Sequence, residues 1–383
     1  MELISDRHPL VIVVGGGGVG KTTLAAALGV TSALGDGLAG GGGEPGRDTL
    51  VMTFDPSLRL KDALGVGEEA RDREVPVDLS GLAGSDAAGG GGAGPARLDA
   101  SLLDAGRTFD RLVTRYAPDE VARERILDNR YYRHLSGGLA GVLEYMAVER
   151  LFEVAAEGRH RQVILDTPPT RQALDFLEAP ERIVGFLDSG ALKIALKPWF
   201  DERGRLKAAS RFGFVGRRFE RFLDDTVGLD DQRDMAEFFQ AFEPLYEGFR
   251  RRARRVEELL RSEQTLFVLV AGPGEERIAD TLFFARRLEE AGYHLGPVVV
   301  NRVHPVTERE PPPLPADPAD PGARLDGRAL LAWLGERDRR GVERLRALLG
   351  PRRPLAALPL LPTEPTGLPA LHDLGRDLLE RLS

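Results

Sequence analysis

The stretch VVGGGGVGKTTLAAALG, Val13–Gly29, decides the fold of this chain, because it holds the pattern G-x-x-x-x-G-K-T from Gly15 to Thr22. Strongly apolar residues precede the pattern, and an alanine- and leucine-rich run of helical character follows it. Glycines let backbone N–H groups turn inward around phosphate oxygens without Cβ collisions, and a helix N-terminus adds positive potential. The stretch therefore predicts a strand, a phosphate-binding loop and a helix.

The loop residues have separate expected tasks. The ammonium of Lys21 can reach the β- and γ-phosphates of a nucleoside triphosphate, and the hydroxyl of Thr22 can bind Mg²⁺. The other loop residues are expected to surround the phosphates: Gly15, Gly16, Gly17, Gly18, Val19, Gly20 and Thr23.

The same glycines also satisfy the dinucleotide-binding pattern G-x-G-x-x-G, with Gly15, Gly17 and Gly20. That pattern does not require the Lys-Thr pair that follows here, and no clear acidic residue ends a second strand about 20 residues further on. The sequence favours a nucleoside triphosphate over a dinucleotide, and both over a purely structural glycine turn.

Short, almost continuously apolar runs recur along the chain, and such runs are typical of strands buried on both faces of a sheet. Helical patterns lie between several of them, for example over 275–291 and 328–348. This alternation predicts an α/β fold with a doubly wound, mostly parallel sheet. The predicted strands are Leu10–Val14, Leu50–Phe54, Val163–Leu165, Leu266–Val270, Val298–Val300 and, more weakly, Leu355–Leu358.

Two long segments, about 98–160 and 175–260, look almost wholly helical and are predicted to form an inserted helical subdomain beside the sheet. The chain is otherwise interpreted as one phosphate-loop domain over 1–383. Glycine- or proline-rich stretches without apolar periodicity predict flexible loops or linkers at 35–48, 84–95 and 308–327.

Two aspartates directly follow apolar runs. Asp55 comes after LVMTF, and Asp166 comes after VIL. The carboxyl ends of parallel strands face the same crevice, so both side chains are expected near the phosphate loop. We expect Asp166 to hold Mg²⁺ with Thr22, and Asp55 to orient or activate the attacking water, while Lys21, the second catalytic residue, stabilises the transferred charge. The simpler interpretation is that each aspartate only caps the turn or helix after it.

The composition excludes several functions. The chain has 383 residues, with 52 Lys+Arg against 60 Asp+Glu, and no cysteine. The net charge of −8 argues against a nucleic-acid partner. The absence of cysteine removes disulfides and thiolate metal sites. Residues 1–9 lack the apolar core of a signal peptide, and no apolar run approaches about 18 residues, so a soluble cytoplasmic protein is expected.

Together, and in this order, the motifs resemble those of the ArsA-type ATPases, which include the arsenical-pump ATPase and the chaperone that targets tail-anchored membrane proteins. The resemblance implies that the ligands are ATP and Mg²⁺, that Asn301 contacts adenine, and that Pro359 and Leu360 flank the base. It covers most of the chain: GGGGVGKTT at 15–23, DPSLRLKDALG at 55–65 and DTPPTRQALDFL at 166–177 (the last two resembling switch segments), VVVNRV at 298–303 and LPLLPTEPTGLPAL at 358–371.

The resemblance also implies ATP hydrolysis coupled to a homodimer that opens and closes, with a hydrophobic client protein or a membrane-protein partner. The chain departs from the family at Gly16, where a signature lysine is usual; Arg59 or Arg171 could supply charge instead. Since cysteine is absent, neither a thiolate arsenite site nor a C-x-x-C zinc site can form in these residues.

An apolar stripe in the second helical segment has three interpretations. Recurrence near i, i+3/4 and i+7 is most often a core face. A groove for an apolar client helix and a surface on anionic lipid are the alternatives. The stripe consists of Met235, Phe238, Phe239, Phe242, Leu245, Tyr246 and Phe249.

Two other classes of function stay open on the sequence. A ParA/MinD-like positioning ATPase would share the loop and the dimer chemistry. A non-catalytic scaffold would bind the nucleotide only to set its conformation.

Overall fold

The computed structural model describes residues 3–35, 46–55, 59–71, 73–82, 97–129, 132, 142–188, 238, 241–307 and 327–383. The chain divides into two compact units. The first is formed by Met1–Leu103, Gly158–Ala173 and Leu260–Ser383, and the second by Asp104–Glu157 and Leu174–Leu259.

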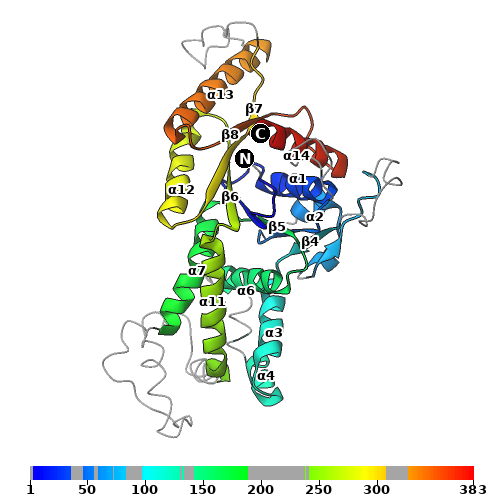
Figure 1. Ribbon diagram of the computed structural model, residues 1–383, viewed down its shortest axis with the longest axis vertical. Helices are drawn as coiled ribbons and strands as arrows, with labels where there is room; N and C mark the ends of the chain where they lie inside the picture. Colours follow the sequence, from blue (N-terminus) through cyan, green and yellow to red (C-terminus); the bar gives the residue numbers. More distant parts are fainter. Residues whose placement is uncertain are drawn as a thin grey trace, which may run out of the picture. The chain divides into compact units, whose positions relative to one another are not determined.

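An eight-stranded sheet with the order β3-β4-β2-β5-β1-β6-β7-β8 forms the centre of the first unit (Figure 1). All neighbours pair in parallel except β3 and β4, which are antiparallel. The strands are β1 Leu10–Gly15, β2 Thr49–Thr53, β3 Val75–Pro76, β4 Leu98–Leu102, β5 Gln162–Asp166, β6 Thr265–Ala271, β7 Leu295–Val303 and β8 Leu355–Pro359.

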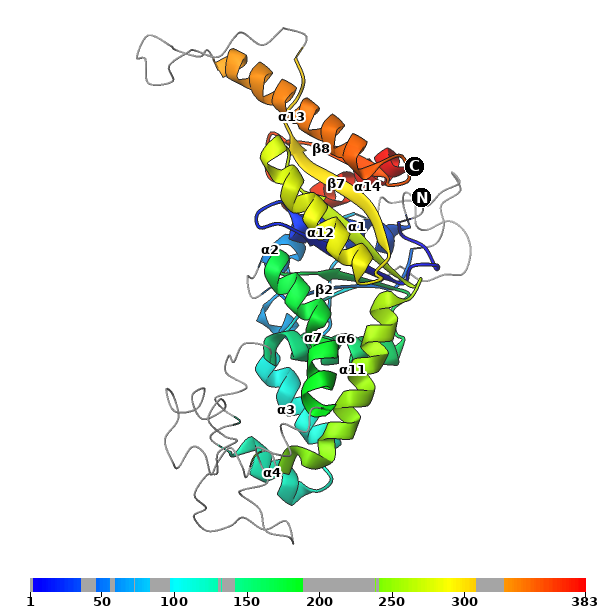
Figure 2. The same cartoon turned by 90° about the vertical axis from the view of Figure 1, so that its left-hand side faces the viewer.

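Helices cover both faces of this sheet. Helices α1 (Lys21–Leu34) and α14 (Leu368–Leu382) lie on one face, whereas α12 (Ile278–Glu290) and α13 (Gly327–Leu349) lie on the other (Figures 1 and 2). The predicted doubly wound, mostly parallel α/β fold is therefore confirmed. The unit also contains α2 (Arg59–Leu64), the start of α7 (Thr170–Asp188) and two short 3₁₀ helices, η1 (Glu68–Ala70) and η5 (Glu275–Arg277).

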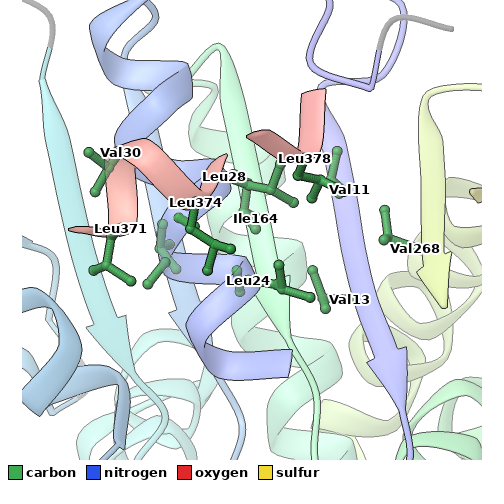
Figure 3. Close-up of a cluster of buried hydrophobic side chains, with 14 of the residues drawn as sticks. Val11, Val13, Leu24, Leu28, Val30, Ile164, Val268, Leu371, Leu374 and Leu378 are labelled. Atoms are coloured by element: carbon green, nitrogen blue, oxygen red, sulfur yellow. The ribbon is translucent and has the colours of Figure 1, made fainter. Parts of the chain in front are cut away.

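The core under α1 and α14 fixes the two elements that flank the phosphate loop. Val11 and Val13 point to one face of β1, because side chains two residues apart share a face of a strand. Leu24 and Leu28 of α1, four residues apart, present one helix face to them. Figure 3 also labels Ile164, Val268 and three leucines of α14 in this cluster: Leu371, Leu374 and Leu378.

The structure corrects the sequence analysis at one sheet edge. Residues 98–102 were expected to be helical, but they form strand β4, and β3 pairs with it. The sequence LDASL alternates apolar and polar residues, a pattern typical of a strand, but the stretch directly precedes helical residues and was grouped with them. Asp99 and Ser101 are nevertheless each only 1% exposed, and Asp99 is held by an ion pair with Arg97 and a contact with His160. The loop predictions at 35–48, 84–95 and 308–327 lie mostly outside the described residues.

The described helices of the second unit are α3 (Ala105–Tyr116), α4 (Glu120–Leu127), α6 (Val142–Glu157), most of α7, the 3₁₀ helix η4 (Glu243–Leu245) and α11 (Tyr246–Arg261). No helix among the described residues of either unit has the length and apolarity needed to cross a bilayer.

The apolar stripe of the second unit packs inside that unit wherever it is described. Phe242 is buried, with its ring centroid 5.1 Å from that of Phe238 and 4.9 Å from that of Phe249. Phe109 of α3 adds an edge-on contact to Phe242 at 5.8 Å. Such ring pairs are typical of a core. Met235 and Phe239 of the stripe lie outside the described residues.

Candidate phosphate-binding site

The loop between β1 and α1 needs glycine at particular positions. A Cβ atom on Gly15 (φ +150) would lie 2.1 Å from the carbonyl oxygen of Val270, and one on Gly20 (φ +95) would lie 2.4 Å from Asn301 Nδ2. By contrast, a Cβ atom on Gly16 would meet only Val19 Cγ1, at an ordinary 3.6 Å. Backbone shape thus requires glycine at the ends of the loop, whereas the second position has room for a side chain.

Lys21, the first residue of α1, folds back over the loop. It is 7% exposed, and its Nζ donates a hydrogen bond to the Gly16 carbonyl oxygen at 2.9 Å. Burial lowers the pKa of Lys21, while the negative charges of Asp166 and Asp55 act in the opposite direction. The ammonium is therefore largely withdrawn from solvent and already at the loop that the sequence assigned to phosphates.

Thr22 and Asp166 meet, although 144 positions separate them. Thr22 Oγ1 donates to Asp166 Oδ2 at 2.7 Å. The sheet sets this contact: β5 ends at Asp166, which is in register with Val13 of β1, just before the loop. The structure thus brings together the two residues that were predicted to hold the metal.

Thr53 is a site residue that the sequence analysis missed. It ends β2 in register with Asp166, and its Oγ1 donates to Asp166 Oδ2 at 3.0 Å. The same hydroxyl accepts a hydrogen bond from the backbone N–H of Asp55 at 3.1 Å. Thr53 therefore links the two carboxylate residues of the site. The signal available in the sequence was a threonine at the last position of an apolar strand, two residues before Asp55.

Asp166 is fully buried, and burial raises its pKa to about 6, against the hydrogen bonds from Thr22 and Thr53. Its second oxygen, Oδ1, is buried with no hydrogen-bond partner among the described residues. An orphaned carboxylate oxygen is costly unless another group engages it. A carboxylate beside a hydroxyl is also the hard oxygen donor set that Mg²⁺ prefers, so these residues fit the predicted metal.

The remaining charged residues assigned to the site lie around Lys21. Asp55 follows β2 and is only partly exposed, and its charge raises the pKa of Lys21. The charge of Arg59, an exposed residue at the start of α2, lowers the same pKa, so Arg59 is close enough to act on the loop. The side chain of Arg171 lies outside the described part of the chain.

The residues predicted to surround adenine lie at the ends of two neighbouring strands. Asn301 Nδ2 donates to the Val19 carbonyl oxygen at 2.9 Å, and its Oδ1 accepts from the backbone N–H of Arg302. Pro359 ends β8, and the Leu360 N–H donates to Val303 of β7 at 2.8 Å. Asn301 thus supports the phosphate loop, which the sequence analysis did not anticipate, and its contact with adenine stays a prediction.

A second group of ligand-type side chains lies at the edge of the sheet. Donor atoms of Glu74, Asp99 and His160 lie within 4.8 Å of one another. However, Arg159 pairs with Glu74 and Arg97 pairs with Asp99, each at 2.9 Å. The two arginines balance both carboxylates, which makes this group a structural charge network instead of a cation site.

A glycine-shaped loop between a buried parallel strand and a helix, with a Lys-Thr pair facing an aspartate on a neighbouring strand, defines the P-loop nucleoside triphosphate-binding class. Residues 8–84 and 127–317, more than half of the chain, match the anion-transporting ATPase family, the ArsA ATPases. The chain belongs to this family, which confirms the resemblance seen in its motifs.

Three relatives illustrate how this chain compares with curated proteins. ATPase GET3 of Kluyveromyces lactis is 27% identical over 229 residues, which cover 57% of this chain and 58% of the relative. The putative arsenical pump-driving ATPase 1 of Aquifex aeolicus is 24% identical over 304 residues, covering 77% of this chain and 63% of the relative. Protein Rv2184c of Mycobacterium tuberculosis is 30% identical over 175 residues, covering 44% and 36%. The chain thus spans less than two thirds of these relatives' own length.

Proposed function

We propose that this protein is a Mg²⁺-dependent ATP-binding and ATP-hydrolysing protein that acts as a nucleotide-driven homodimer switch coupled to a client or membrane partner. The observation that carries the proposal is that Lys21, Thr22 and Asp166 come together at the phosphate loop, with Lys21 and Asp166 buried. A purely structural glycine turn would need neither a buried ammonium nor a buried carboxylate.

The loop provides the groups that bind the triphosphate. Backbone N–H groups from Gly15 to Thr23 surround the phosphate oxygens, and the N-terminus of α1 adds positive potential. Lys21 exchanges its hydrogen bond with the Gly16 carbonyl for one with a phosphate oxygen. Because Lys21 is buried, its charge acts on the developing charge of the transferred phosphoryl group with less screening by water than at the surface.

Thr22 and Asp166 are the residues that would hold Mg²⁺. When bound, Mg²⁺ neutralises charge on the phosphate oxygens. Asp166 would offer its orphaned Oδ1 to the ion, directly or through water, while Thr53 keeps the other oxygen in place through a hydrogen bond.

Asp55 is assigned to the attacking water. It leaves the carboxyl end of β2, on the same edge of the sheet as the loop. A carboxylate there accepts a hydrogen bond from water and orients it toward the γ-phosphate. The hydrogen bond from the Asp55 N–H to Thr53 fixes the start of this segment.

The homodimer and its client or membrane partner are inferred from the single phosphate loop and from the relatives. One phosphate loop per chain favours a pair of identical subunits, and relatives named ATPase GET3 and putative arsenical pump-driving ATPase 1 support an ATP-driven task, which we place in the cytoplasm. Because these 383 residues contain no cysteine, a thiolate site for arsenite or zinc is excluded from them. A hydrophobic client protein or a membrane-protein partner is the expected cargo or target.

The test compares the wild type with Lys21→Ala and with Arg339→Ala, which removes a cation from the exposed, ion-paired surface of α13. Calorimetry with ATP, with and without Mg²⁺, and single-turnover hydrolysis are measured on all three. We expect Lys21→Ala to lose affinity and turnover together and Arg339→Ala to keep both. Binding without single-turnover hydrolysis would favour the scaffold, and ATP-dependent sedimentation with liposomes or nucleoids would favour the positioning ATPase.

A further inference from the structure

Two consecutive side chains at the carboxyl end of β7, those of Asn301 and Arg302, donate hydrogen bonds to the phosphate loop, and we call this pair of contacts the clasp. Asn301 Nδ2 donates to the Val19 carbonyl oxygen at 2.9 Å, and Arg302 Nη1 donates to the Gly18 carbonyl oxygen at 3.0 Å. In a regular strand, consecutive side chains point to opposite faces, so both could not reach the same loop.

A local distortion of β7 makes this double contact possible. Arg302 has φ +64 and is, within the described ranges, the one non-glycine residue with positive φ. The pairing of β7 with β8 also shifts register between Val300 and Val303. Bulges of this kind re-aim side chains, and a left-handed arginine persists only where its surroundings hold it. The strain therefore lies at the residue that contacts the loop.

The clasp fixes the orientation of two peptide groups in the loop. In a planar trans peptide the C=O and N–H bonds point in opposite directions. With the carbonyls of Gly18 and Val19 held by β7, the N–H groups of Val19 and Gly20 point away from β7. A charged donor on a carbonyl also polarises the peptide, which makes its N–H a stronger donor.

Gly20 gives a second observation that the clasp is built into the loop. A Cβ atom at this position would lie 2.4 Å from Asn301 Nδ2. The absence of a side chain at Gly20 thus leaves the space that the Asn301 amide occupies. Asn301 and Arg302 thus fit the loop although they lie 282 and 284 positions after the residues that they contact.

We propose that Arg302 is a positioning residue for phosphate binding: it holds the Gly18 carbonyl so that the amides of the loop are oriented toward phosphate before the nucleotide arrives. This inference rests on the proposed function. Its competitor is a surface role, because Arg302 Nη2 also lies 3.6 Å from Glu364, an exposed residue. If Arg302 positions the loop, replacing Arg302 weakens phosphate binding and replacing Glu364 does not. If its role is at the surface, replacing Glu364 has the same effect as replacing Arg302.

The experiment uses the full chain and four variants: Arg302→Gly, Arg302→Ala, Arg302→Lys and the control Glu364→Gln. Binding of a fluorescent ADP analogue, and its displacement by ADP and by pyrophosphate, is measured with Mg²⁺. Arg302→Gly removes the guanidinium but relieves the left-handed strain, so its melting temperature is expected to stay the same or rise.

We expect Arg302→Gly and Arg302→Ala to bind ADP and pyrophosphate roughly tenfold more weakly, the scale of one hydrogen bond with a charged donor. Arg302→Lys should recover part of this loss, and Glu364→Gln should bind like the wild type. An equal loss for both ligands identifies phosphate as the group affected, because pyrophosphate has no base.

Three results overturn the proposal. Arg302→Gly could bind both ligands like the wild type, it could lose affinity for ADP only, or Glu364→Gln could reproduce its loss. A wild type that binds no nucleotide would remove the proposed function along with this inference. A wild type that binds, with Lys21→Ala weakened and Arg302→Gly unchanged, would remove the inference alone.

Discussion

Thr22 Oγ1 lies 2.7 Å from Asp166 Oδ2, so the first turn of α1 and the end of β5 are joined at the place where Mg²⁺ is proposed to bind. Thr22→Val keeps the shape of the side chain but removes the oxygen. We expect it to retain nucleotide binding and to lose roughly a hundredfold or more in turnover, because the metal loses a ligand. Hydrolysis measured against Mg²⁺ concentration checks this. Thr22→Ser, which keeps the hydroxyl, should restore activity, and an active Thr22→Val would remove the metal assignment.

The buried state of Asp166 predicts a pH dependence of stability. Its pKa is raised to about 6, above the value of 3.8 that applies to the unfolded chain. The native state therefore keeps a proton that the unfolded state releases, so this contribution to stability is present below about pH 4 and is lost as pH rises toward 6. Relative to Asp166→Asn, which does not titrate, the wild type should lose about 2 kcal/mol of unfolding free energy between about pH 4.5 and 7.5. Denaturant titrations of both proteins with a chelator present measure the difference, and parallel profiles would contradict it.

The hydrogen bonds of Thr53 predict an effect on catalysis that Thr49, at the start of the same strand, does not share. Thr53→Val removes the hydrogen bonds with Asp166 and with the Asp55 N–H. We expect turnover to fall on the order of tenfold to a hundredfold, because both carboxylate residues lose a support. Steady-state hydrolysis at saturating ATP measures it.

Thr49→Val is the matched control for Thr53. Thr49 begins the same strand, is equally buried, and its hydroxyl also has two partners, the Arg47 carbonyl oxygen and Ser32 Oγ. Both variants should lose about 1–3 kcal/mol of stability, but only Thr53→Val should lose turnover. Equal kinetic losses would show that the effect is a general one on stability.

The two glycines at the start of the loop should differ sharply. Gly15→Ala places a Cβ atom 2.1 Å from the Val270 carbonyl oxygen and should destabilise the protein by about 2 kcal/mol or more. Gly16→Ala makes only an ordinary contact and should change stability by less than about 0.5 kcal/mol. Chemical denaturation of both variants measures this. A destabilised Gly16→Ala would show that the departure from the family at this position is enforced by shape.

Asp55→Asn should separate binding from chemistry. We expect the variant to bind ATP with Mg²⁺ like the wild type and to lose roughly a hundredfold or more in kcat, the scale of a general-base contribution. Calorimetry and single-turnover hydrolysis on the same preparation supply the two numbers. Normal hydrolysis by Asp55→Asn would move the water-orienting role to another residue.

The sequence was sufficient where the information is local. The loop from Gly15 to Thr22 carries its own chemistry, and the apolar runs carried six of the eight strands. Strand β4 was missed because its short stretch was grouped with the helical residues that follow it, and its polar residues Asp99 and Ser101 are buried in the sheet, where Arg97 and His160 satisfy Asp99. A polar residue looks exposed until its partner is known.

The sequence by itself determined the class of fold, the phosphate loop and the two aspartates at strand ends, because spacing and apolar periodicity are properties of neighbouring residues. Only the tertiary structure decided that Thr53 links those aspartates and that Asn301 and Arg302 clasp the loop. These contacts depend on strand register and on a bulge in β7, which bring together residues up to 284 positions apart. Register is set by the packing of the whole sheet, so no local pattern in the chain contains it.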